Sequence, residues 1–204
     1  MHSRFSDPAS PLRGAALPKL GGPTFPLSDR LKRLGWSLSW LLLARWTPPQ
    51  FLPLRRALLR LYGARLHPTA NIRSSAKIWW PAHLEMGPHA SLGPGVICYN
   101  VAPVVIEADA DVSQRAHLCT ASHDISDPTF PLVSCPITVR RRAWVAAEAF
   151  VGPGVVVGRG AVLAARAVTV RDLDDWTVYA GNPARPVGTR PVLEAAPADA
   201  QSAA

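Results

Sequence analysis

Apolar residues recur every six positions along much of this 204-residue chain. In its second half, one set of inward positions comprises Val139, Val145, Val151, Val157 and Leu163, and a second set comprises Ala143, Ala149, Val155, Ala161 and Ala167. A period of six matches neither an α-helix, at ~3.6 residues per turn, nor a single strand, with a period of ~2. Each group of six can hold one short strand and one turn, and such hexapeptide repeats predict a parallel β-helix.

The repeat begins at Ile72 and predicts an all-β fold of about five coils. The inward positions fall into sets of three: Ile72, Ile78 and Leu84; Met86, Leu92 and Cys98, after a two-residue offset; Ile106, Val112 and Leu118; Val139, Val145 and Val151; and Val157, Leu163 and Thr169. Three groups of six close one triangular coil, so we expect residues ~18 apart to stack and three parallel sheets to form a prism. Glycines between the apolar positions suit the corners, where a positive φ or a close backbone approach is needed.

The repeat lapses over residues 123–136, which contain three prolines. This segment is too long for a corner, so we predict a loop extruded from the prism. Loops on a rigid scaffold are where binding and catalytic residues concentrate. The lapse therefore marks the first place to look for a functional site.

The segments on either side of the repeat differ from it in composition. Residues 1–28 are rich in Pro, Gly and Ser without any period, and we predict that they are disordered. Residues 29–65 have the pattern of a basic amphipathic helical segment, which prolines within 48–53 divide into two pieces. Residues 66–188 then form the predicted β-helix domain, and the Ala- and Pro-rich residues 189–204 form a tail that we also predict to be disordered.

The basic charge is confined to the N-terminal third. Residues 1–65 hold eleven Lys and Arg against two Asp, a net charge of +9, whereas residues 66–204 hold eleven Lys and Arg against twelve Asp and Glu, a net charge of −1. No helix-turn-helix, zinc-finger or RNA-recognition motif accompanies the basic residues, so nucleic acid is not an expected partner.

Two interpretations of residues 30–61 stay open. Trp and Leu beside Arg and Lys suit a helix lying on an anionic membrane surface, because the apolar run 34–46 is shorter than the ~20 residues of a spanning helix. Alternatively, the segment packs against the repeat domain or a neighbouring subunit. The run has no cleavage site of a signal peptide, and three cysteines without a C-x-x-C pair indicate reduced thiols. We therefore expect a cytoplasmic protein, peripheral to the inner membrane face under the first interpretation.

Three further motifs narrow the class of β-helix. They are Tyr99-Asn100-Val101-Ala102-Pro103, Thr120-Ala121-Ser122-His123-Asp124 and Tyr179-Ala180-Gly181-Asn182-Pro183-Ala184-Arg185. With the Trp- and Leu-rich N-terminal segment, they resemble the hexapeptide-repeat acyltransferases, and among these the colanic acid biosynthesis type and the maltose, galactoside and nodulation acetyltransferases. The resemblance covers nearly all of residues 30–188. It implies a left-handed β-helix, acetyl-CoA-dependent O-acetylation of a sugar in exopolysaccharide assembly, and a homotrimer with its sites between subunits.

The reaction that the resemblance implies removes a proton from a sugar hydroxyl, which is a poor nucleophile. The imidazole of a histidine is largely neutral at pH 7 and can accept that proton. His123 stands where the repeat gives way to the loop, and in the resembling family the corresponding histidine is the general base. Asp124 or Asp127 could orient the imidazole by accepting its second N–H, and the alternative role of both is to form turns.

The resemblance also suggests residues for the two substrates. Asn100, Asp127 and Trp144 would border a free or lipid-linked sugar acceptor, although Asn100 is alternatively a corner residue and Trp144 alternatively packs at a subunit contact. Small residues would line the groove for coenzyme A, and arginines would hold its phosphates. The residues matched to this cofactor are Ala146, Ala164, Ala165, Arg171, Asn182 and Arg185. Ala146 and Ala164 stand where the family often has Gly.

Two other classes of function stay open beside this one. The first is a non-catalytic trimeric scaffold that presents the basic helices to a partner. The second is a metalloenzyme like the β-helical carbonic anhydrases, which bind zinc through histidines shared between subunits. Its pairs would be His83 with His89 and His117 with His123, which are six residues apart and so fall on different faces. We expect acetyl-CoA as co-substrate and no metal.

Overall fold

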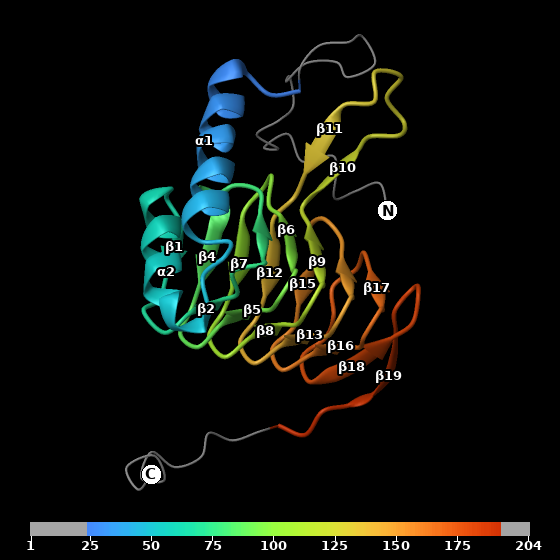
Figure 1. The fold of residues 1–204 in the computed structure, drawn as a ribbon. Coiled ribbons are helices and arrows are strands. Elements are labelled where there is room, and N and C mark those ends of the chain that lie inside the picture. The colour runs from blue at the N-terminus through green and yellow to red at the C-terminus, as the bar shows by residue number, and fades with distance from the viewer. Residues whose placement is uncertain (1–23, 193–204) are drawn as a thin grey trace, which may run out of the picture.

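The computed structural model describes residues 24–192, which fold into a triangular prism of short strands with two helices at its N-terminal end (Figure 1). Sheet A consists of β1 (Arg65–Leu66), β4 (Leu84–Met86), β7 (Val104–Ile106), β12 (Ile137–Val139) and β15 (Val156–Val157). Sheet B consists of β2 (Asn71–Ile72), β5 (Ser91–Leu92), β8 (Asp111–Val112), β13 (Trp144–Val145), β16 (Val162–Leu163), β18 (Thr177–Ala180) and β19 (Arg185–Thr189). Sheet C consists of β3 (Lys77–Ile78), β6 (Ile97–Tyr99), β9 (His117–Cys119), β14 (Phe150–Val151) and β17 (Val168–Thr169).

The strands of each sheet are parallel, except that β19 runs antiparallel to β18 at the C-terminal end. Five coils are complete, and β18 together with Leu173, which bridges to Val157, begins a sixth. The parallel β-helix of about five coils is thus confirmed. The predicted disorder of residues 1–28 and 189–204 lies mostly outside the described residues, but Leu27, Ser28 and Thr189 belong to regular elements.

The interior of the prism is filled by the residues that the six-residue period places inward. Val139, Val145, Val151, Val157 and Leu163 are completely buried, and so are Ala149, Val155, Ala161 and Ala167 from the second set. Burying a Val or Leu side chain contributes roughly 1.5–3 kcal/mol. A row of such residues along each sheet therefore contributes much of the stability of the prism.

The coils do not all have the predicted length. Residues stack 18 apart only in the C-terminal half, where Val145 pairs with Leu163. In the N-terminal half they stack 20 apart, as Leu92 does on Val112. The extra two residues lie in sheet A, where both Leu84 and Met86 point inward from one three-residue strand. The two-residue offset in the sequence is thus part of every early coil.

Corner conformations repeat from coil to coil. His89, Asp109, Arg142 and Gly160 each stand two residues before a strand of sheet B, Trp176 stands one residue before β18, and all five have φ between 56° and 65°. Only one of these five is a glycine, so glycine marks the corners less often than predicted. At Gly160 a Cβ atom would lie 2.3 Å from the Trp176 ring, so the next coil excludes any side chain there.

The N-terminal segment forms α1 (Leu27–Leu43), the short 3₁₀ helix η3 (Pro49–Phe51) and α2 (Leu52–Leu61), and a second 3₁₀ helix, η4 (Pro81–His83), lies between β3 and β4. Helix α2 covers the first coil with Leu58 and Leu59 buried. Its Arg55 is also buried, and the guanidinium donates to the carbonyls of Ile72 at 2.9 Å and Pro48 at 2.9 Å. Burial lowers the pKa of Arg55. These bonds fasten α2 to the preceding turn and to sheet B.

Helix α1 is held by fewer contacts. It buries Trp36 and Trp40 against the edge of sheet C, and the Trp36 indole N–H donates to the Ile78 carbonyl at 2.8 Å. Figure 1 shows α1 standing alongside the prism with its N-terminal end pointing to the side from which the hairpin β10–β11 projects. Neither α1 nor any other described helix is long and apolar enough to cross a bilayer.

Candidate functional site

The predicted loop is an antiparallel hairpin of β10 (Ala121–His123) and β11 (Leu132–Ser134), which leaves the prism after sheet C (Figure 1). Its turn is ordered by side chains that accept hydrogen bonds from nearby backbone. Asp124 accepts from the Ser126 N–H at 2.9 Å, and Asp127 accepts from the Thr129 N–H at 2.8 Å. The hairpin base is closed by the Cys135 N–H, which donates to the Thr120 carbonyl at 2.9 Å.

His123 ends β10 and is half-buried. Its Nδ1 lies 3.0 Å from the carbonyl oxygen of Phe130, and its ring stacks on the Phe130 ring with centroids 4.4 Å apart and planes 7° apart. A carbonyl oxygen can only accept, so Nδ1 carries the hydrogen and Nε2 carries the lone pair. The hairpin therefore fixes both the plane and the tautomer of an imidazole suited to accept a proton at Nε2.

The two aspartates near His123 form turns. The Asp124 carboxylate accepts hydrogen bonds from the N–H and the hydroxyl of Ser126, at 2.9 and 2.5 Å. The Asp127 carboxylate binds the N–H and hydroxyl of Thr129, and these bonds lower the pKa of Asp127. The group that contacts Nδ1 of His123 is the Phe130 carbonyl. The turn contacts of Asp124 and Asp127 are consistent with the turn-forming role that the sequence left open beside an orienting one. Sequence reasoning missed Phe130, because nothing in a residue name reports where its backbone carbonyl points.

The residues predicted for the acceptor do not come together in one chain. Asn100 is completely buried, accepting from the Trp80 N–H at 3.0 Å and donating to the Trp80 carbonyl at 2.7 Å. These contacts are those of a corner residue, and they occupy both ends of the amide. Trp144 lies on sheet B, 44% exposed, and its indole N–H donates to the Ser113 hydroxyl at 2.8 Å. His123 and Trp144 are thus borne by different sides of the prism.

The residues matched to coenzyme A lie along the later coils. The amides of Ala146 and Ala164 donate to the next coil, to the carbonyls of Leu163 at 2.9 Å and Tyr179 at 2.8 Å. Ala165 is exposed at a corner of the same coil. These backbone donors are already engaged within the chain, so a ligand on this face would meet the small side chains and not these two N–H groups.

The predicted phosphate ligands gather at the C-terminal end of sheet C. Arg171 follows β17, and the Ala184 N–H donates to the Val168 carbonyl of the same strand at 2.8 Å. Arg185 and Asn182 flank that contact in sequence, and Arg171, Asn182 and Arg185 are all exposed. The structure therefore brings two exposed arginines to one end of the prism, of which Arg185 donates to the Ala184 carbonyl at 3.3 Å.

The described residues contain no group of three or more His, Cys, Asp or Glu side chains arranged to hold a metal ion. His83 Nδ1 lies 3.3 Å from the Asn100 carbonyl oxygen, and the His117 ring packs edge-on against Phe150. Burial lowers the pKa of His117. One histidine of each pair considered for zinc, His83 and His117, is thus engaged in a structural contact of its own.

Comparison with known proteins identifies the class. The chain is 36% identical over 152 residues to an Escherichia coli protein named as the colanic acid biosynthesis acetyltransferase WcaF. The aligned region covers 74% of this chain and 83% of that relative. A maltose O-acetyltransferase from Clostridium difficile superposes with a TM-score of 0.72 at 19% identity, over 81% of this chain and 89% of that one. A hexapeptide-repeat acetyltransferase of Vibrio cholerae complexed with acetyl-CoA gives a TM-score of 0.67 at 20% identity, over 82% and 92%. No protein-family model matches the chain.

The coiled prism has the fold of the hexapeptide-repeat acetyltransferases, and the predicted left-handed β-helix is confirmed by these structural relatives. The chain belongs to the family of the colanic acid biosynthesis acetyltransferases. It is an acyltransferase, as the sequence motifs predicted.

Proposed function

We propose that this protein transfers the acetyl group of acetyl-CoA to a hydroxyl of a saccharide in exopolysaccharide assembly, with His123 as general base. The observation that carries the proposal is the fixed tautomer of His123. Its Nδ1–H is held by the Phe130 carbonyl at 3.0 Å, which leaves the Nε2 lone pair for a substrate proton. The relative named for colanic acid biosynthesis supports the choice of an exopolysaccharide acceptor.

The acetyl group passes directly from the thioester of acetyl-CoA to the sugar hydroxyl. Nε2 of His123 takes the proton of the sugar hydroxyl while the hydroxyl oxygen forms a bond to the thioester carbonyl carbon. The carbon–sulfur bond then breaks, and the departing thiolate receives the proton from the imidazolium to give free coenzyme A. Because the Phe130 carbonyl accepts from Nδ1–H throughout, it also stabilises the imidazolium that forms between the two steps.

Coenzyme A is proposed to lie along the later coils. The small residues Ala146 and Ala164 leave room beside the backbone, and the exposed Arg171 and Arg185 supply charge for its phosphates. The structural relative bound to acetyl-CoA supports this donor. Since His123 and Trp144 lie on different sides of one chain, we also propose a homotrimer in which a neighbouring copy completes each site. Equilibrium sedimentation at a single-chain mass would contradict the trimer.

The variant His123→Ala tests the proposed base. We expect transfer to fall by about 10²–10⁴-fold, because the proton acceptor is lost, while the coil structure and the affinity for coenzyme A are retained. His67→Ala is the matched control, since His67 is exposed on the first coil and bonds only Thr69. Near-normal turnover of a saccharide by His123→Ala, measured by release of free thiol, would refute the assignment.

The exposed face of α1 supports a proposal about location. Leucines spaced alternately by four and three residues, together with Leu42 next to the last of them, form a stripe opposite the buried Trp36 and Trp40, and each is at least 46% exposed. The leucine stripe consists of Leu27, Leu31, Leu34, Leu38, Leu41 and Leu42. We propose that it lies in the surface of an anionic membrane, with Arg30, Lys32 and Arg45 at the headgroups.

Sedimentation with phosphatidylglycerol vesicles tests the membrane contact. We expect the wild type to sediment with the vesicles and Leu34→Glu/Leu38→Glu to stay in the supernatant, because two charges interrupt the apolar stripe. Ile125→Glu is the control, since Ile125 is 81% exposed but lies in the hairpin turn. Equal sedimentation of the double variant and the wild type would assign the stripe to another contact.

A further inference from the structure

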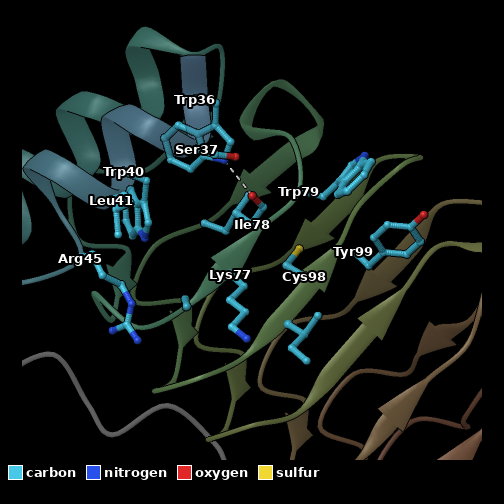
Figure 2. A pocket seen from close by; sticks show the side chains of 12 residues that line it. Trp36, Ser37, Trp40, Leu41, Arg45, Lys77, Ile78, Trp79, Cys98 and Tyr99 are labelled. Atoms are coloured by element: carbon cyan, nitrogen blue, oxygen red, sulfur yellow. Dashed lines mark hydrogen bonds between the residues drawn. The ribbon is translucent and has the colours of Figure 1, made fainter. Parts of the chain in front are cut away.

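A groove of about 490 Å³ lies between α1 and the edge of sheet C, apart from the predicted acceptor and coenzyme residues (Figure 2). Trp40, Leu41 and Arg45 border it from the helix side, and Lys77, Trp79 and Tyr99 border it from the strand side. Its walls are mostly apolar, and its charged lining consists of two cations without a carboxylate. A ligand that fits such a surface has a long apolar part and an anionic group.

A second observation also points to a ligand with acceptor atoms. The indole N–H of Trp40 is buried and has no hydrogen-bond acceptor among the described residues. The neighbouring Trp36 differs, because its N–H is satisfied by the Ile78 carbonyl. Buried polar groups are nearly always hydrogen-bonded in folded proteins. A phosphate oxygen beside Arg45 would supply the acceptor that Trp40 lacks.

The groove continues towards the hairpin that bears His123. Trp79 and Tyr99 form its far wall, with ring centroids 5.0 Å apart, and they pack on the small cluster of Val101, Ala121 and Leu132. Leu132 is the cross-strand partner of His123 in the hairpin. The side chain of Arg33 lies over the Trp79 ring, 4.6 Å from its centroid, at the same end. A molecule seated in the groove can therefore extend along aromatic surface to the base of the hairpin.

We propose that this groove binds the lipid phosphate of a lipid-linked saccharide acceptor, an inference that rests on the proposed sugar acetylation. The apolar chain lies against Trp36 and Trp40, the phosphate meets Arg45, Lys77 and the Trp40 N–H, and the saccharide extends over Trp79 and Tyr99 towards His123. Leu41 belongs both to the groove and to the leucine stripe of α1. A lipid chain can thus pass from the membrane surface into the groove without crossing water.

Binding of a simple alkyl phosphate tests the proposal without any acetyl transfer. The probes are decyl phosphate below its micelle concentration, decanol and inorganic phosphate, followed by the fluorescence of the groove tryptophans in the full-length protein. We expect decyl phosphate to bind at least about tenfold more tightly than decanol, because the cations and the Trp40 N–H recognise its phosphate, and inorganic phosphate not to compete.

Variants assign the binding to the groove. Arg45→Glu/Lys77→Glu should weaken decyl phosphate by about tenfold or more while changing decanol little, and Trp40→Phe should weaken only the phosphate probe. The matched control Arg73→Glu/Arg140→Glu reverses two exposed charges elsewhere and should bind like the wild type. His123→Ala should also bind normally, so loss of acetylation and loss of lipid binding are read separately.

Three results would overturn the proposal. One is equal binding of decyl phosphate by the wild type and the charge-reversed variant. Another is binding of monomeric dihexanoylphosphatidylglycerol as tight as that of decyl phosphate, which would make the groove a phospholipid site. The last is a changed sedimentation mass of Arg45→Glu/Lys77→Glu, which would assign the groove to a contact between subunits.

Discussion

The regular coils and the hairpin β10–β11 are held in place by different kinds of interaction. In the coils after the hairpin, most inward residues are Val, Ala or Leu with almost no exposed surface, and their identity follows from their place in the period. In the hairpin, His123 is half-buried and is held by one carbonyl and one ring, both from Phe130. Burial decides the residues of the coils, whereas hydrogen-bond geometry decides those of the hairpin.

The difference extends to how each region depends on its neighbours. A coil is stabilised by the coils above and below it, as in other solenoids, so a change in one coil spreads to the next. The hairpin is tied to the prism mainly at its base, through the Cys135 N–H and the small cluster of Val101, Ala121 and Leu132. The fold should therefore survive the loss of the hairpin, while the reaction should not.

Removal of the hairpin has the largest expected effect, because it separates the stability of the coils from the acetyl transfer reaction. Residues stack 33 apart across the hairpin and 18 apart in the following coils, so deletion of residues 121–135 leaves a coil of the later length. We expect far-UV circular dichroism and sedimentation to match the wild type, because the strands of all three sheets keep their partners. Acetyl transfer should fall to background. An unfolded deletion variant would show that the hairpin also holds the coils together.

The sequence predicted the coils better than the hairpin for a physical reason. Inward positions such as Val145 and Leu163 follow from periodicity, because a repeated backbone gives every sixth side chain the same surroundings. The 20-residue coils were not predicted, since Leu84 and Met86 both point inward from one strand and break the period locally. An error of this kind changes the coil length without moving any residue from the core to the surface.

The site was predicted as far as side-chain chemistry could indicate it. His123 became the candidate base because it sits where the period fails and matches the histidine of the resembling family. Its partner was not predicted, because the group that orients the imidazole is the Phe130 carbonyl, and Phe130 reaches it through a backbone with φ of 52°. Asn100 is the opposite case, because its side-chain chemistry suggested a sugar ligand. In the fold, its amide is hydrogen-bonded to the Trp80 backbone instead.

A Leu→Ala substitution in the coils and another in the hairpin test whether the two regions contribute differently to stability and to acetyl transfer. Leu118→Ala removes a completely buried side chain from sheet C and should lower the free energy of unfolding by about 2–5 kcal/mol. Leu132→Ala changes the hairpin residue opposite His123 and should cost less stability while it lowers the rate of transfer. Urea unfolding and thiol release measure the two effects. Similar losses of stability in both variants would contradict the independence of the hairpin.

The smallest expected effect is a pH-dependent change in the hairpin turn. Hydrogen bonds from the Thr129 hydroxyl and N–H lower the pKa of Asp127 below its ordinary value of 3.8. A carboxylate with a lowered pKa in the fold stabilises the turn fully above its ordinary value, and this contribution is lost as the pH falls through the lowered pKa. The amide proton shift of Thr129, followed by NMR between about pH 2 and 6, should therefore titrate with a midpoint below 3.8. Thr129→Val removes one donor and should move the midpoint upwards, and Asp127→Asn should abolish the titration. A wild-type midpoint at or above the ordinary value would mean that the turn is not closed by these bonds in solution.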